Sequence, residues 1–400
     1  MTYSHVRKHT TMKSNRNLLY YYIYSITRAA ILTRGIFLIY LQQKGLSIVE
    51  VSMYSVVYNK CTAVSEVPTG YIGDRIGRKN SIITGTILLA CQAGLMVVAQ
   101  EKVWLILLAG LEAVAYTFIS GSDSALLYQM LASRKMEDQY LKINSRILAA
   151  QLAVMGGAIF IGAQLAQYSW NLPYLLTMLI LIVAAGFMCR VKDLMPFAER
   201  EKRTGKLIKT LKDNILYRPL GMFLLFFIGI SMIDGIACGY YNLNQLILES
   251  VGISVSAIGL FFSLSYIGNS FAYLAVSPLN RIFNRSRIIF LALITECLGF
   301  LWLSQVQNKG LFFVISLILC FVPEIIFTVA DSIIQEWIVE RNRATMLSVM
   351  SLIRSLCSGV IYGIFGILLE IVTIEQFLIF LAVGFGVSAV SVLIVLRKSR

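Results

Sequence analysis

Apolar segments of about twenty residues or more recur along the whole 400-residue chain, separated by short polar connections. A helix of that length crosses the roughly 30 Å hydrocarbon core of a bilayer. Because lipid offers no hydrogen-bond partners to open backbone, such segments must be helical. We therefore predict an all-α polytopic membrane protein with twelve transmembrane helices, at residues 17–43, 47–73, 81–100, 103–131, 142–168, 171–191, 219–248, 255–279, 287–306, 310–337, 344–370 and 374–396.

Basic residues divide unevenly between the connections of this predicted topology. If the N-terminus is cytoplasmic, the connections on that side and the two tails carry 26 of the 35 Lys and Arg residues. The connections on the other side carry three, Lys44, Lys102 and Lys309. Cytoplasmic loops of membrane proteins are enriched in Lys and Arg. The pattern predicts a multi-pass protein of the inner or plasma membrane with both termini in the cytoplasm.

The longest connection lies at the midpoint of the chain and predicts a division into two halves. Six predicted helices precede it and six follow it, so the expected units are an N-terminal bundle (1–191), a linker (192–218) and a C-terminal bundle (219–400). In the linker, Leu207, Ile208, Leu211 and Ile215 fall on one face of a possible helix whose other face is basic. This pattern fits a surface helix on anionic headgroups. A solvated basic linker is an equally good interpretation.

Composition argues against several other classes of protein. The chain is 58% hydrophobic and 14% charged, whereas soluble domains carry roughly 25% charged residues. The net charge of +14 is explained by the topology, so no nucleic-acid partner is expected. The two histidines, His5 and His9, lie in the polar N-terminal tail, and the seven cysteines form no close pair. We predict neither a metal site nor a cofactor, and no motif for nucleotide binding or nucleophilic catalysis indicates an enzyme.

The most specific local motif lies between the second and third predicted helices. It reads Gly70-Tyr71-Ile72-Gly73-Asp74-Arg75-Ile76-Gly77-Arg78-Lys79. This segment resembles the signature loop of the major facilitator superfamily, G-x-x-x-D-R-x-G-R-[KR], at every defined position. The matching residues are Gly70, Asp74, Arg75, Gly77, Arg78 and Lys79, and Gly73 is a further glycine of the same loop. The glycines allow a short connection to pass close between helices.

The resemblance implies a fold of two pseudo-symmetric six-helix bundles and a gating role for this loop, which would lock the two halves on the cytoplasmic side. The equivalent place in the second half, residues 279–285, keeps the basic residues but has Asn280 in place of the aspartate. Bacterial proton-coupled efflux members of the family are the most similar in pattern. Two features of drug exporters are missing, a glycine-proline signature in the fifth helix and an arginine in the fourth, where Glu112 lies.

A second sequence pattern is repeated in the two halves. Asp123 precedes Arg146 by 23 positions, and Asp331 precedes Arg354 by the same distance. Each pair is symmetric about a predicted cytoplasmic turn, so its members lie at equal depth in an antiparallel hairpin. We predict that both pairs form structural or gating ion pairs, while a direct role in substrate binding is the alternative.

Other ionisable residues within the predicted helices are unequally divided. If Asp123 and Asp331 take these arginines, the first half keeps three bases and two acids, and the second keeps three acids and no base. Ionisable residues inside a membrane are functional candidates. The resemblance places helices 1, 4, 7 and 10 around a central cavity. Arg34 is expected to pair with Glu112, with Lys60 as the rival partner. The residues predicted to bind protons or line the cavity are Arg34, Glu112, Asp234, Tyr241, Gln245, Glu324 and Thr328, with Asp234 and Glu324 the leading proton carriers.

These features predict a secondary active transporter that works by alternating access. Proton-coupled export of a small amphipathic or drug-like compound is the leading hypothesis, with protons and membrane lipids as further partners and a monomer as the expected state. An importer, or a lipid or sugar transporter of the same superfamily, is the first alternative. A non-transporting membrane sensor is the second, and the short central linker argues against it.

Overall fold

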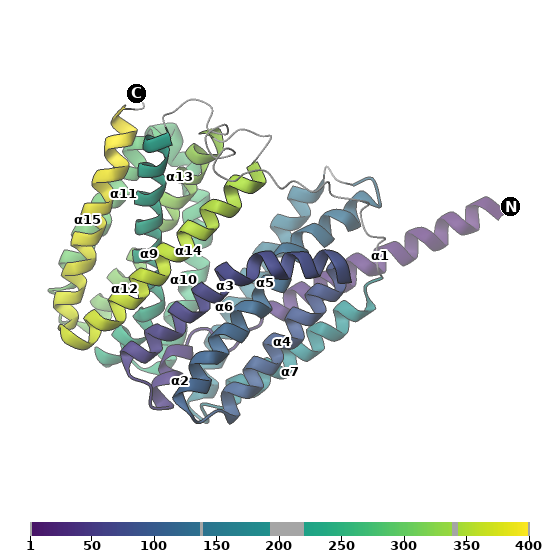
Figure 1. Ribbon diagram of the computed structural model, residues 1–400, viewed down its shortest axis with the longest axis horizontal. Helices are drawn as coiled ribbons and strands as arrows, with labels where there is room; N and C mark the ends of the chain where they lie inside the picture. Colours follow the sequence, from purple (N-terminus) through teal and green to yellow (C-terminus); the bar gives the residue numbers. More distant parts are fainter. Residues whose placement is uncertain (1, 137–138, 193–219, 338–342, 399–400) are drawn as a thin grey trace. The chain divides into compact units, whose positions relative to one another are not determined.

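The computed structural model contains helices throughout (Figure 1). It describes residues 2–136, 139–192, 220–337 and 343–398. The predicted linker helix, and some side chains that include that of Asp74, lie outside what is described. The helices are α1 (Thr2–Ala29), α2 (Phe37–Gln43), α3 (Ile48–Ile76), α4 (Arg78–Val98), α5 (Lys102–Ala132), α6 (Tyr140–Ala166), α7 (Leu172–Arg190), α9 (Leu220–Ser250), α10 (Val255–Ile282), α11 (Arg285–Leu303), α12 (Lys309–Leu319), α13 (Val322–Trp337), α14 (Arg343–Ile371) and α15 (Ile374–Lys398).

Two of the predicted spans are interrupted. The first is divided into α1 and α2 by the turn at residues 30–36, and the tenth is divided into α12 and α13 at Cys320 and Phe321. Within the described residues, nine segments are long and apolar enough to cross a membrane on length and composition alone. The polar residues of α1 and α3 keep these helices outside that set. The all-α polytopic architecture is confirmed.

The chain forms two compact units. Unit 1 contains residues Met1–Phe37 and Val64–Arg200, and unit 2 contains Leu38–Ala63 and Glu201–Arg400. Residues 38–63, which cover α2 and the first part of α3, thus pack with the second unit although they lie early in the sequence. The predicted halves at 1–191 and 219–400 describe the repeat in the sequence and remain a prediction.

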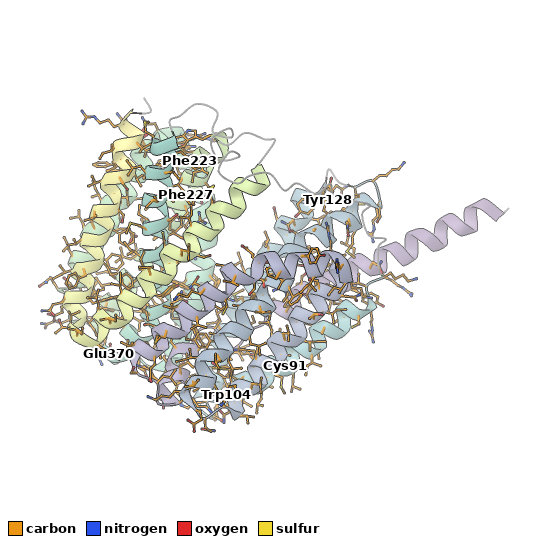
Figure 2. The ribbon with its side chains drawn as sticks, viewed as in Figure 1. Cys91, Trp104, Tyr128, Phe223, Phe227 and Glu370 are labelled. Atoms are coloured by element: carbon orange, nitrogen blue, oxygen red, sulfur yellow. The ribbon has the colours of Figure 1, made fainter. Side chains whose placement is uncertain are left out.

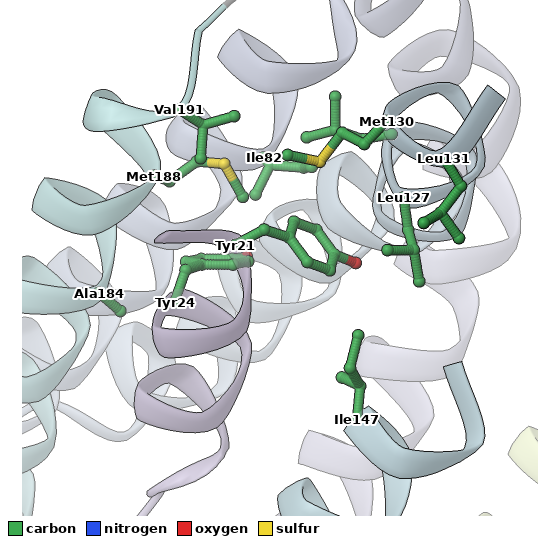
Figure 3. Close-up of a cluster of buried hydrophobic side chains, with 11 residues drawn as sticks. Tyr21, Tyr24, Ile82, Leu127, Met130, Leu131, Ile147, Ala184, Met188 and Val191 are labelled. Atoms are coloured by element: carbon green, nitrogen blue, oxygen red, sulfur yellow. The ribbon is translucent and has the colours of Figure 1, made fainter. Parts of the chain in front are cut away.

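Unit 1 is built around α4, which packs on α5 and α7, while α1 packs on α6 and α7. Its core contains aliphatic side chains around Tyr21 and Tyr24 (Figure 3). Gly162 of α6 lies against the interrupted first span, because a Cβ at this position would be 1.8 Å from the Leu32 carbonyl oxygen. Any other residue at 162 would therefore force α6 away from the turn at 30–36.

Unit 2 is built around α9, which packs on α14 and α15, and α11, which packs on α13 and α15. Aromatic rings fill its core. The Tyr240 and Phe300 rings meet edge to face at 4.7 Å, and Phe223 stacks on Phe227 (Figure 2). Many large apolar side chains remain exposed on the helices of both units, Trp104 and Val387 among them. Since lipid is the solvent of these surfaces, this exposure is expected of a membrane protein.

The junction of α3 and α4 differs from the predicted loop. Residues 70–76 continue α3, and only Gly77 separates the two helices. Gly77 has φ 89° and ψ 144°, a conformation that is almost restricted to glycine. The helical residue Gly73 has another role, because a Cβ there would lie 2.9 Å from Ser81 Oγ, so α3 and α4 approach closely. The Arg75 guanidinium lies over the Tyr71 ring at 4.6 Å.

The first prediction concerns this junction. Gly77→Ala is expected to destabilise the protein by about 1–3 kcal/mol, because the backbone conformation is strained for alanine. Space is not limiting, since no atom lies within 4 Å of a Cβ at this position. Gly70→Ala is the matched control: Gly70 is helical and equally open, so alanine is expected to be neutral or mildly stabilising. Thermal unfolding in detergent compares the two, and equal midpoints would contradict the assignment.

Candidate functional site: an arginine–carboxylate cluster in each unit

Asp123 of α5 is the centre of a polar cluster in unit 1. Arg28 of α1 places a terminal guanidinium nitrogen 3.2 Å from Asp123 Oδ2. The Tyr21 hydroxyl donates a hydrogen bond of 2.6 Å to Asp123 Oδ1. The ion pair is largely buried, with side-chain exposures of 16% for Arg28 and 18% for Asp123. Tyr24 lies one turn from Arg28, whose guanidinium is 5.7 Å from the centre of the Tyr24 ring.

This arrangement corrects one of the two predicted ion pairs. Arg146 is exposed on α6, and the ionic partner of Asp123 is Arg28. Equal distance from a turn places two residues at equal depth, but it does not fix the faces of the helices on which they lie. Arg28 is one of the basic residues within the first predicted helix, and its pairing with Asp123 was not predicted.

Arg354 of α14 is the centre of the corresponding cluster in unit 2. Its Nε lies 3.6 Å from Asp234 Oδ2 on α9, and a terminal nitrogen lies 3.6 Å from Asp331 Oδ1 on α13. The predicted contact between Asp331 and Arg354 is therefore present, while its gating role remains a prediction. The two carboxylates differ in environment, since the Asp331 side chain is 56% exposed and that of Asp234 is 13% exposed.

The acids of unit 2 form a group around this arginine. Asp234 interacts electrostatically with Arg354, Glu324 and Asp331, and it accepts a hydrogen bond from the Cys238 thiol at 3.7 Å. The expectation that Asp234 has no basic partner in its own half is wrong, because Arg354 serves two acids. A sequence repeat suggests one partner for each arginine, but the fork of a guanidinium can bind two carboxylates.

Gln245 has a different position from the one expected. It is buried, and its Oε1 accepts a hydrogen bond of 3.1 Å from the backbone N–H of Leu38, in the first turn of α2. Glu370 of α14 (Figure 2) accepts a similar bond of 3.1 Å from the N–H of Val49, in the first turn of α3. The first N–H groups of a helix have no partner within that helix. These two side chains therefore attach residues 38–63 to the rest of unit 2.

The remaining predicted residues occupy less constrained positions. Tyr241 is half-buried and meets the ring of Phe262 edge to face at 5.1 Å. The Thr328 hydroxyl donates to the Glu324 backbone carbonyl of its own helix at 2.7 Å. Arg34 lies in the turn at 30–36 and donates to the Tyr116 hydroxyl at 3.3 Å. Its predicted pairing with Glu112 remains a prediction.

Two further features of unit 2 were not predicted from the sequence. The Tyr362 hydroxyl accepts a hydrogen bond from the Asn242 amide and donates one to the Cys238 carbonyl, which ties α14 to α9 beside Asp234. Glu296 of α11 is completely buried, and neither of its carboxyl oxygens has a hydrogen-bond partner among the described residues. Asn242, a polar residue eight positions after Asp234 on the same helix, is a weak sequence signal for the first feature. Glu296 was visible in the sequence as an acid within a predicted helix.

The chemistry available at these clusters is exchange of protons and charge. Within the described residues, no group of three or more His, Cys, Asp and Glu side chains has a geometry that could hold a metal ion. Carboxylates beside a guanidinium in a membrane can change their partner or their protonation state. Among the described residues, the ion pair of unit 1 balances one base with one acid, whereas Arg354 of unit 2 faces two acids.

The second prediction tests the corrected pairing in unit 1. Arg28→Gln is expected to destabilise the protein by roughly 3 kcal/mol, because it leaves Asp123 largely buried without its cation. Arg146→Gln removes the same charge from an exposed position and is expected to have little effect. Thermal unfolding midpoints of the two variants in detergent check this. A larger loss for Arg146→Gln would restore the original pairing.

Comparisons with known proteins agree with the helical fold and with the motif at residues 70–79. The family model of the Major Facilitator Superfamily matches residues 19–244 and 225–400. The crystal structure of a point mutant of the nucleoside transporter NupG superposes with a TM-score of 0.82 at 12% identity, covering 94% of this chain and 99% of that one. A bacterial homolog of the human lysosomal transporter Spinster, in an inward-facing and occupied conformation, gives 0.72 at 13% identity, with 97% of each chain covered. Among curated proteins, no sequence matches this chain.

These structural similarities, at such low identity, show a common fold and do not identify a substrate. The family match covers nearly the whole chain and agrees with the signature motif at residues 70–79. The chain belongs to the Major Facilitator Superfamily and is a secondary transporter rather than an enzyme.

Proposed function

We propose that this transporter couples the movement of its substrate to a proton bound by the carboxylates around Arg354. The observation that carries the proposal is the contact of one guanidinium with both Asp234 and Asp331. With both acids ionised, these three groups carry a net charge of −1 inside a membrane-spanning bundle. Uptake of one proton makes the group neutral, which removes the cost of an unbalanced charge in a medium of low polarity.

The two acids suit different parts of the cycle. Asp331 is the more exposed, so water can deliver or remove a proton there. Asp234 is mostly buried and borders Glu324 and Cys238, which suits a site that senses the substrate. When one acid is protonated, Arg354 can interact fully with the other. This exchange of partners links α9, α13 and α14, and movement of these helices would change access to the site.

For direction and substrate, we propose proton-driven export of a small amphipathic or drug-like compound. The resemblance to bacterial efflux members at residues 70–79 supports this direction. Both termini would be cytoplasmic because of the charge asymmetry of the loops. We further propose that the segment with Asp74 gates the cytoplasmic side and that the protein works as a monomer. We also propose that the predicted cavity residues other than the buried Gln245 line the substrate path. Import, or transport of a lipid or sugar, is the second candidate.

Transport by purified protein in proteoliposomes with an imposed pH gradient tests this function. The panel should contain cationic drugs, sugars, lipids and nucleosides, the last because one structural neighbour is a nucleoside transporter. Accumulation of a drug-like compound against its gradient, driven by protons moving in the opposite direction, is the expected result. Accumulation in the direction of proton flow would favour import. No response of any compound to the pH gradient would contradict proton coupling.

The third prediction concerns the proton-binding acid. Asp234→Asn mimics the protonated form permanently, so it is expected to abolish accumulation driven by a pH gradient while exchange of labelled substrate across the membrane continues. Glu324→Gln tests the neighbouring acid in the same way. Exchange at equal substrate concentrations controls for folding and binding.

Glu375→Gln is the matched control, because Glu375 is an exposed acid in the first turn of α15. It is expected to retain pH-driven transport. If Asp234→Asn and Glu324→Gln both behave like this control, the coupling proton binds elsewhere or the transporter is not proton-coupled.

A further inference from the structure

Glu296 differs from Asp234 and Asp331 in having no hydrogen-bond partner among the described residues. Its side chain is 0% exposed, and both carboxyl oxygens are buried without a hydrogen bond within the described residues. It lies on the buried stripe of α11, between Leu293 and Phe300. An ionised carboxylate in such a place would lose its hydration without compensation. The surroundings therefore require a neutral, protonated acid in this conformation.

The groups that face Glu296 do not supply a base. Tyr240 of α9 and Cys320 at the α12–α13 interruption interact with it electrostatically, and Cys297 is its neighbour on α11. The Tyr240 hydroxyl is bonded to Ser316 of α12. Among the described residues, none on α10, α13 or α15, which also pack on α11, makes a hydrogen bond to either carboxyl oxygen of Glu296.

The hydroxyl and amide groups nearby also have partners of their own. Ser316 Oγ accepts a hydrogen bond of 3.3 Å from the Asn244 amide in addition to its contact with Tyr240. A carboxyl kept only to stabilise packing would be expected to donate to one of these oxygens. Glu296 makes no such bond, so an acid in this apolar stripe is better explained by a proton that it binds than by its packing.

Glu296 also lies in a series of acids that reaches an exposed position. Cys320 interacts electrostatically with both Glu296 and Glu324. Cys238 interacts in the same way with Glu324 and Asp234. Arg354 then connects Asp234 to Asp331, whose side chain is 56% exposed. The series begins at Glu296 on α11 and passes Cys320 at the interruption of the tenth span. Helix interruptions in transporters are places where ions bind and where segments move.

We propose that Glu296 is a second proton-binding site, the buried end of a series of acids that continues through Glu324 and Asp234 to Asp331. In the step proposed, a proton leaves a Glu296 carboxyl oxygen and binds a carboxylate oxygen of Glu324, which leaves Glu296 negative and Glu324 neutral. Movement at Cys320 and Phe321 would admit the water that a charged Glu296 needs. The transfer rests on the proposed proton coupling, whereas the protonated state of Glu296 does not.

Infrared spectroscopy of the purified protein in lipid membranes tests the protonated state without any transport. A neutral carboxylic acid gives a C=O stretching band that an ionised carboxylate lacks. We expect a component of this band at neutral pH in the wild type that is lost in Glu296→Gln and kept in Glu375→Gln. If the band is the same in all three proteins, Glu296 is ionised and the proposal is wrong.

Transport assays test the exchange of this proton. Glu296→Gln is expected to lose pH-driven accumulation but keep substrate exchange at equal concentrations. Glu296→Met, of similar volume and without a polar group, should behave in the same way and serves if the glutamine variant does not fold. Full pH-driven transport in a variant that has lost the infrared band would mean that the acid is protonated but static, which overturns the exchange.

The outcomes separate this proposal from the proposed function. If Asp234→Asn loses coupling while Glu296→Gln keeps it, the function stands and the second site falls. If the wild type shows no response to a pH gradient, both proton coupling and the proposed transfer are wrong, and the infrared band still decides whether Glu296 holds a proton. Transport by the wild type that requires Na⁺ instead of a pH gradient would likewise overturn proton coupling and the proposed transfer, while leaving the protonated state of Glu296 to the infrared band.

Discussion

A chain in lipid can interrupt a helix only where other groups take over its backbone hydrogen bonds, and this constraint explains much of the arrangement here. At the turn between α1 and α2, the N–H of Leu32 donates to the Thr177 hydroxyl at 3.2 Å, and the N–H of Leu38 donates to Gln245. Gly162 leaves room for the Leu32 carbonyl. At the second interruption, Gly268 leaves room for the Phe321 ring, since a Cβ there would lie 2.1 Å from its Cζ. The first interruption therefore depends on hydrogen bonds to residues far away in the sequence. At the second, the N–H groups of Cys320 and Phe321 bond to carbonyls of the preceding turn, and the distant Gly268 supplies only space.

The same medium makes charge balance the second constraint. Among the described residues of unit 1, Arg28 has one ionic partner, Asp123, and the Tyr21 hydroxyl donates a further hydrogen bond to that carboxylate. In unit 2, Arg354 has two ionic partners, and Glu324 lies near. An excess of acid is costly in a bundle of apolar helices unless a proton neutralises it. Unit 1 is thus suited to a fixed structural role at this position, and unit 2 to a change of protonation.

The fold could be predicted from the sequence because several independent features of the sequence indicate it. Apolar runs give the helices, the loop charges test the number of helices, and residues 70–79 identify the family. Only one of the two ion pairs could be predicted from the sequence. The Asp331–Arg354 contact follows from spacing, but the choice of Arg28 over Arg146 depends on how α1 packs against α5. The buried position of Gln245 and the sharing of Arg354 also follow from contacts between distant helices, which periodicity along one helix does not specify.

The central claim is that the carboxylates around Arg354 carry the coupling proton. Counting protons moved per substrate molecule tests it most directly, with a pH-sensitive dye inside proteoliposomes and a compound found to be transported. The account predicts a fixed proton count in the wild type and none in Asp234→Asn, while exchange of substrate continues in both. An unchanged proton count in both Asp234→Asn and Glu324→Gln, with normal transport, would contradict it.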